Sequence, residues 1–217
     1  MKRQQSGFTL VEIAIVLVII GLLLGGILKG QELINSAKVK NLANDYRVIP
    51  TYIYAYQDRF KTLPGDDCQA GTHLGAPAVD VSPCTAPAGN GVIGGNWNST
   101  TATDESYLFW QHVRLANLAA GPTAAGYPLP TNAVGGPIGV SSATAAQLQI
   151  AGMTGTYQIC SGGIQGKFAR QLDSTLDDGV TNTGSVRVVP DPSALNATAA
   201  VLTPADDGNV YIVCMTF

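Results

Sequence analysis

The sequence has little of what most enzymes and nucleic-acid-binding proteins need. Only 12% of its 217 residues are charged, and its two histidines, His73 and His112, lie far apart with no second histidine or cysteine at metal-ligand spacing. The chain contains no G-x-S-x-G, no phosphate-binding loop and no H-E-x-x-H. Its net charge of -3 supplies no basic field for nucleic acid. These absences argue against a hydrolase, a zinc enzyme or a nucleic-acid-binding protein.

Long apolar runs are also missing from most of the chain, which after its first third is rich in Gly, Ala, Thr, Asn and Pro. The exception is Phe8–Leu28, a run of 21 residues whose only charge is Glu12. At about 1.5 Å per residue this run forms a helix of roughly 31 Å, which is enough to cross a hydrocarbon core. We therefore expect one membrane-spanning helix.

The residues before the apolar run indicate how this helix is oriented and processed. Lys2 and Arg3 provide a positive flank that stays in the cytoplasm, so the body after Leu28 is expected on the outer side. A secretory signal places its apolar region before a small-residue cleavage site, whereas here the small residue Gly7 comes first. Cleavage after Gly7 would remove the charged leader and keep the helix.

The segment Gly7-Phe8-Thr9-Leu10-Val11-Glu12 resembles the prepilin-type signal of type IV pilins and type II secretion pseudopilins. The resemblance implies that a prepilin peptidase cuts between Gly7 and Phe8 and methylates the new amine of Phe8. It also implies that Glu12 is the assembly glutamate. Many pilins have a proline shortly after the apolar stretch, where this chain has Gly25, Gly26 and Lys29, and the choice between major pilin and pseudopilin stays open.

The physical chemistry of Glu12 supports a functional role independently. A carboxylate in a membrane helix costs several kcal/mol unless it is paired or protonated. The amine that cleavage creates on Phe8 of a neighbouring subunit would neutralise Glu12 as helices stack in a filament. Two alternatives stay open: Glu12 is solvated at the membrane interface, or it bonds to the amine of its own Phe8, four residues away.

The first helix is expected to extend beyond the membrane to about Phe60. Its apolar residues recur every three or four positions, as in a helix that packs one face on a domain: Leu42, Tyr46, Ile49, Ile53, Tyr56 and Phe60. Pro50 is expected to interrupt and bend this helix near Tyr46, because proline lacks an N–H and clashes with the preceding turn.

The remaining chain is expected to form an α+β head, in which a small antiparallel sheet packs on the long helix in the layout that the pilin resemblance implies. A loop is predicted over Asp66–Asn98, one helix begins at Thr103-Asp104-Glu105 and stops before Gly121-Pro122, and a shorter helix carries Phe168, Leu172 and Leu176. Predicted strands are Thr156–Cys160, Ser185–Val189 and Val210–Phe217.

All four cysteines, Cys68, Cys84, Cys160 and Cys214, follow the apolar segment. An even number in an exported domain predicts two disulfides, and four cysteines allow three pairings. We favour Cys68 with Cys84, which closes a short loop, and Cys160 with Cys214, which ties neighbouring strands. The alternative is four buried free thiols in a cytosolic protein.

Acidic pairs in loops are the candidate metal ligands. Asp66 with Asp67, and Asp206 with Asp207, offer oxygen ligands of the kind that calcium takes, although neither pair fits the EF-hand pattern. The alternative is that these are solvated turn carboxylates. We expect no other cofactor.

These observations together predict a non-enzymatic filament subunit divided into a leader (1–7), a transmembrane and assembly helix (8–28), an amphipathic half-helix (29–63) and a disulfide-stapled head (64–217). The expected partners are further copies of the chain, prepilin peptidase and an assembly machinery in the bacterial inner membrane, from which the subunit passes into a pilus. The alternatives are a type II secretion pseudopilin in a periplasmic pseudopilus, and a single-pass anchored binding domain that never polymerises.

Overall fold

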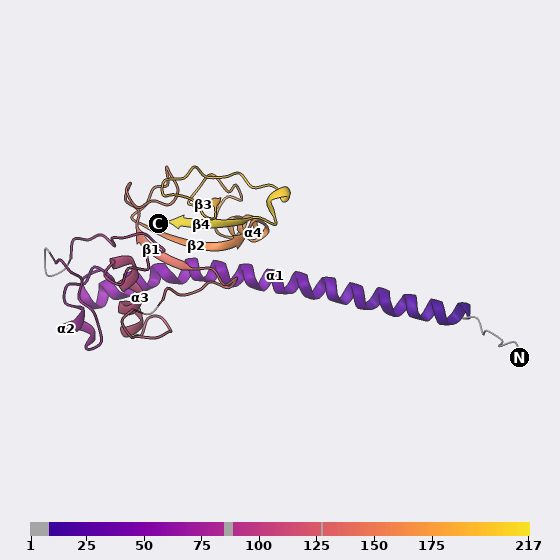
Figure 1. The fold of residues 1–217 in the computed structure, drawn as a ribbon, viewed down its shortest axis with the longest axis horizontal. Helices are drawn as coiled ribbons and strands as arrows, with labels where there is room; N and C mark the ends of the chain where they lie inside the picture. The colour runs from indigo at the N-terminus through magenta and orange to yellow at the C-terminus, as the bar shows by residue number, and fades with distance from the viewer. Residues whose placement is uncertain (1–8, 85–88, 127) are drawn as a thin grey trace, which may run out of the picture. The chain divides into compact units, whose positions relative to one another are not determined.

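The computed structural model describes residues 9–84, 89–126 and 128–217, and the chain forms two compact units, Met1–Lys38 and Val39–Phe217. One long helix, α1 (Leu10–Phe60), supplies nearly all of the described first unit and continues into the second (Figure 1). The domain boundaries predicted from the cleavage site and the membrane-spanning run remain predictions.

In the second unit, one face of α1 packs into the head. The predicted stripe is confirmed up to Tyr56, since these residues are buried on α1: Val39, Leu42, Ala43, Tyr46, Ile49, Ile53 and Tyr56. The predicted interruption at Pro50 is wrong, because α1 stays helical through it to Phe60. Burial of Ile49 and Ile53 on either side of the proline offsets its cost of about 3 kcal/mol in a helix interior.

The described residues form one antiparallel sheet of four strands in the order β1-β2-β4-β3 (Figure 1). The strands are β1 (Ile138–Ser142), β2 (Tyr157–Gln165), β3 (Val186–Pro190) and β4 (Val210–Thr216). Three of them were predicted, whereas β1 was not. The buried face of α1 and the sheet share one hydrophobic core, so the predicted α+β fold with a pilin-like layout is confirmed.

The other helical elements of the described residues are shorter. They are α2 (Ala70–Leu74), α3 (Glu105–Leu115), α4 (Gly166–Leu176) and the 3-10 turn η1 (Pro204–Asp206). Helices α3 and α4 were predicted, but α3 ends before Leu118 because Asn117 adopts a left-handed backbone conformation with φ of 60°. The region predicted as a plain loop over 66–98 contains α2, which is too short to leave a periodic signal.

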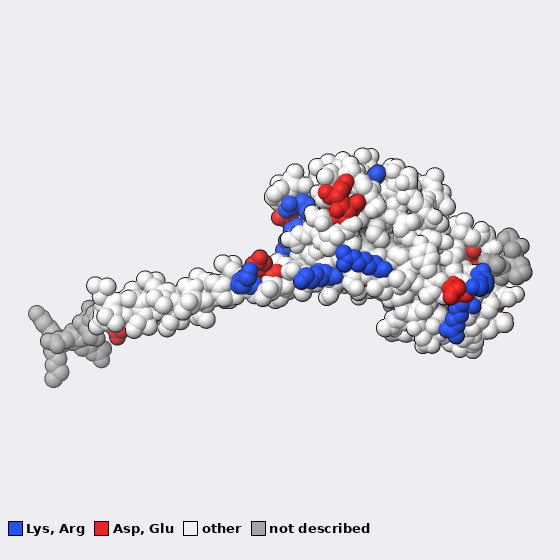
Figure 2. All heavy atoms as spheres, turned by 180° about the vertical axis from the view of Figure 1, so that it is seen from behind, with Lys and Arg blue, Asp and Glu red and all other residues white. Residues whose placement is uncertain are grey.

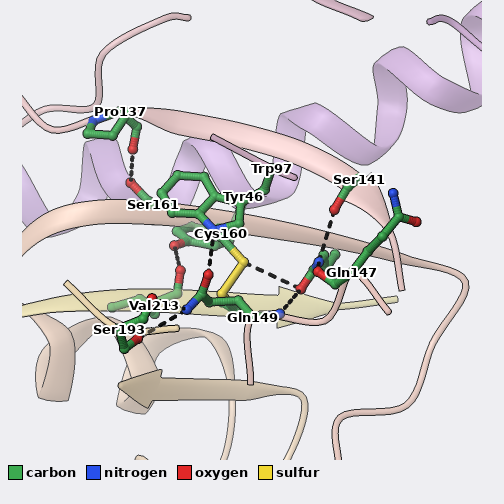
Figure 3. The surroundings of a disulfide bond; sticks show 12 residues. Tyr46, Trp97, Pro137, Ser141, Gln147, Gln149, Cys160, Ser161, Ser193 and Val213 are labelled. Atoms are coloured by element: carbon green, nitrogen blue, oxygen red, sulfur yellow. Dashed lines mark hydrogen bonds between the residues drawn. A yellow bond between two sulfur atoms is a disulfide. The ribbon is translucent and has the colours of Figure 1, made fainter. Parts of the chain in front are cut away.

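Two disulfides lie among the described residues, Cys68–Cys84 and Cys160–Cys214, which is the favoured pairing. Cys160 and Cys214 stand directly opposite each other on β2 and β4. Beside this disulfide, the indole N–H of Trp97 donates to Gln149 at 3.0 Å (Figure 3). The side-chain amide of Gln149 in turn donates to Ser193, so a polar network joins three loops beside the disulfide.

Candidate processing and assembly site

The first part of α1 exposes an almost unbroken apolar surface. Large side chains from Leu10 to Leu28 are exposed, with Leu10 at 88% and Leu22 at 73%. Figure 2 shows this part of the helix free of charge except for one acidic residue near its start. In the described part of the chain, α1 is the one helix long and apolar enough to cross a membrane. An apolar surface of this extent requires a lipid or protein cover.

The acidic residue at the start is Glu12, and it caps the helix. Thr9 donates its backbone N–H and its hydroxyl to Glu12 Oε2, each at 2.8 Å. The Glu12 backbone N–H in return donates to the Thr9 hydroxyl at 3.3 Å. This reciprocal arrangement is a capping box, which satisfies two backbone donors that a helix start otherwise leaves without partners.

The capping box uses only part of the carboxylate. Among the described residues, Glu12 Oε1 has no hydrogen-bond partner, so this oxygen is available to a cation from another chain. Gly7 and Phe8 lie outside the described residues, so both the cleavage site and the pairing of Glu12 with a Phe8 amine stay predictions. The capping box was not among the predictions, although the pattern Thr9-x-x-Glu12 indicates it.

A charged pair marks the end of the apolar run. Lys29 Nζ lies 2.6 Å from Glu32 Oε2, and both side chains are 69% exposed, so the pair itself adds little stability. Between Glu12 and Lys29 the helix sides are open, since a Cβ added at Gly21 or Gly25 would meet nothing within 4 Å. The described site is therefore a bare apolar helix with a single carboxylate at its start.

Comparison with known families identifies this arrangement. Residues 2–28 match the prokaryotic N-terminal methylation motif. It is the prepilin-type signal of type IV pilins and pseudopilins, so the predicted resemblance is confirmed over these residues. The methylation motif includes Gly7, Phe8 and Glu12, and it fits a chain anchored in a membrane through its N-terminal helix. No curated protein and no solved structure matches the chain.

In the head, the carboxylates of the first acidic pair, Asp66 and Asp67, already have hydrogen-bond partners within the chain. Asp66 accepts the backbone N–H groups of Asn90 at 3.1 Å and Gly91 at 2.7 Å, and its burial raises its pKa. Asp67 accepts the Tyr56 hydroxyl at 2.7 Å and contacts His73 Nδ1 at 2.7 Å. Both side chains are buried, and Asp67 ties the start of the Cys68–Cys84 loop to α1, while Asp66 ties it to residues 90 and 91.

The second acidic pair also has internal partners. Asp206 Oδ2 accepts the backbone N–H of Thr203 at 2.8 Å, and Asp207 pairs with Arg170 on α4. Among the described residues, no group of three or more His, Cys, Asp or Glu side chains is placed to hold a metal ion. Calcium at either pair stays a prediction, which a comparison of melting temperatures with calcium and with chelator would test.

His112 on α3 is a fully buried histidine with partners on both ring nitrogens. Its Nδ1 accepts the Gly65 N–H at 3.0 Å. Its Nε2 lies 2.8 Å from the Val79 carbonyl oxygen, so it bridges two loops. Burial lowers its pKa, which favours the neutral ring that this pair of contacts requires.

Proposed function

We propose that this chain is a structural subunit of a type IV pilus-like filament, made as a prepilin, cleaved after Gly7 and polymerised through its N-terminal helix. The observation that carries the proposal is the exposed apolar run of α1 from Leu10 to Leu28, which contains Glu12 near its start and lies within the methylation motif. A helix with this surface is stable in a bilayer before assembly and among the helices of other copies afterwards.

Glu12 supplies the register of assembly in this proposal. Its Oε1 accepts a hydrogen bond from the methylated amine that cleavage leaves on Phe8 of the preceding subunit, while Oε2 keeps its hydrogen bonds from Thr9. Pairing two opposite charges in an apolar surrounding is far more favourable than leaving either alone, so subunits add only where the two groups meet. The head then decorates the outside of the filament and is not required to carry out chemistry.

Two substitutions of Glu12 separate its capping role from its charge. Glu12→Gln keeps an oxygen that accepts from Thr9, so it retains the capping box but removes the negative charge. Glu12→Ala removes both. We expect both variants to be cleaved after Gly7 and both to reduce filament yield at least tenfold, measured by quantifying sheared filaments from cells that express the full assembly machinery.

The matched control is Glu32→Ala, which removes an exposed carboxylate of the same helix beyond the apolar run. It should leave filament yield unchanged. Wild-type yield from Glu12→Gln would overturn the proposed charge pairing, and cleaved wild-type chains that never leave the membrane would favour a simple anchored domain. Filaments that form only with a type II secretion machinery would assign the chain to the pseudopilins.

A further inference from the structure

The outer edge of β3 is covered by the segment 177–184, which links α4 to this strand. The Val188 N–H donates to the Thr181 carbonyl oxygen at 3.0 Å, and the Ala200 N–H donates to the Val188 carbonyl oxygen at 2.8 Å. The Thr181 hydroxyl joins segment 177–184 to the residues around Ala200. It donates to the Ala200 carbonyl oxygen and accepts from the Leu202 N–H. A free strand edge pairs readily with other chains, and this cover prevents it.

Beneath the start of this segment lies a carboxyl group without a partner. Asp173 on the last turns of α4 is fully buried, and neither of its oxygens has a partner in full hydrogen-bond geometry in the described structure, although the backbone N–H groups of Gly179 and Val180 lie near enough to lower its pKa. The nearby Val180 N–H donates to Asp178 instead, at 2.9 Å. A buried ionised carboxylate without partners is costly, so the closed arrangement favours the protonated form of Asp173.

The charges around Asp173 act in the same direction. Groups on the surrounding elements are Asp177 and Asp178 after α4, Arg47 on α1, Arg187 on β3, Tyr211 on β4, and Arg170, Asp206 and Asp207 near η1. The arginines bond elsewhere, since Arg47 reaches the Thr175 carbonyl, Arg187 the Gly184 carbonyl and Arg170 the Asp207 carboxylate. Burial first, and then the charges of Asp178 and Asp177, raise the pKa of Asp173 to about 6, although the backbone N–H groups of Gly179 and Val180 act in the opposite direction.

We propose that Asp173 is the proton sensor of a latch, in which segment 177–184 closes over the edge of β3 while Asp173 is protonated and opens when Asp173 ionises. Opening lets water reach the carboxylate, which removes the cost of burying its charge. The same movement withdraws Thr181 from Val188 and exposes a strand edge for pairing with a second copy of the chain. The open state is thus more populated in neutral surroundings than in mildly acidic ones.

Hydrogen–deuterium exchange of the full chain in detergent micelles tests this latch, with each rate normalised to the intrinsic exchange rate at the same pH and with chelator present. In wild type, the opening constant reported by the Val188 amide should rise roughly tenfold between pH 5 and pH 7.5, for a pKa that moves from 3.8 when open to about 6 when closed. Amides at the pairing of β2 with β4 should stay protected throughout.

Two variants discriminate the latch from general loosening. Asp173→Asn is neutral at every pH and should abolish the pH dependence at Val188. Asp178→Asn keeps an oxygen for the Val180 N–H but removes a neighbouring negative charge, so it should move the transition to lower pH. A pH-independent Val188 amide in wild type, an unchanged transition in Asp178→Asn, or equal loss of protection across the sheet would each overturn the proposal.

Discussion

Tyr46 on α1 donates its hydroxyl to the backbone carbonyl oxygen of Val213 on β4 over 2.8 Å. Both residues are fully buried, and Val213 lies on a central strand of the sheet. The bond gives the helix and the sheet one directional contact in addition to apolar packing. It fixes the rotation of α1 about its own axis within the head, because packing alone tolerates small rotations.

Replacing this tyrosine should weaken the head measurably. Tyr46→Phe keeps the ring but leaves the Val213 carbonyl without this donor, so we expect a loss of about 1 to 2 kcal/mol in the free energy of unfolding. Denaturant unfolding of the full chain in detergent measures it. Tyr54→Phe is the matched control, because Tyr54 lies on the same helix and is 56% exposed. Equal losses in the two variants would contradict the role assigned to the bond.

A second stability prediction concerns the close approach of β1 to Trp97. A Cβ at Gly139 would overlap the backbone carbonyl of Trp97, and backbone cannot move aside cheaply. Gly139→Ala should therefore destabilise the head by about 1 to 3 kcal/mol. Gly208→Ala provides the control, since a Cβ there meets nothing within 4 Å. An unaltered melting temperature in Gly139→Ala would show that β1 is not held where it is described.

The stability of the head should depend on pH through Asp173. Its folded-state pKa of about 6 lies above the 3.8 of an unburied aspartate, so its contribution is present at low pH and is lost as pH rises from about 4 to 6. His112 acts in the opposite direction, because its lowered pKa removes stability as pH falls. The difference in melting temperature between wild type and Asp173→Asn isolates the aspartate, and it should grow with pH across this window.

Processing gives a direct test of the leader. Gly7→Val should leave the chain uncut in the membrane, because a branched side chain at the cleavage site obstructs the peptidase. Mass spectrometry of membrane fractions distinguishes precursor from mature chain. Gly208→Val, a glycine substitution in an open region of the head, should be processed normally. Filaments built from uncut Gly7→Val chains would refute the link between cleavage and assembly.

Elements with a strong local pattern could be predicted from the sequence. The stripe from Leu42 to Tyr56 and the spacing of Phe168 and Leu172 each repeat with the period of a helix, and both lie on helices. The strand β1 has no comparable pattern, since Ile138–Ser142 includes a glycine and two serines and is buried along its whole length. β1 pairs with β2, and its Ser142 N–H donates to the Ile93 carbonyl oxygen. Both interactions depend on parts of the chain that are distant in the sequence.

The candidate site residues also differ in how far they could be predicted from the sequence. Glu12 could be singled out because a lone carboxylate in an apolar run is costly wherever it lies, and its capping partner is only three residues away. The aspartates of the head could not be interpreted from the sequence. Asp66 bonds to residues more than twenty positions later, and Asp207 pairs with Arg170 on another element. Only the fold distinguishes such a structural carboxylate from a metal ligand.

The disulfide between β2 and β4 has a mechanical consequence for the sheet. A force that separates β4 from β2, starting at Thr216, can break their backbone pairs only as far as Cys160 and Cys214, because a covalent bond joins these two opposed residues. The segment from Cys160 to Cys214, which contains β3, is therefore a closed covalent ring, and its two ends stay together even where the hydrogen bonds between β2 and β4 give way.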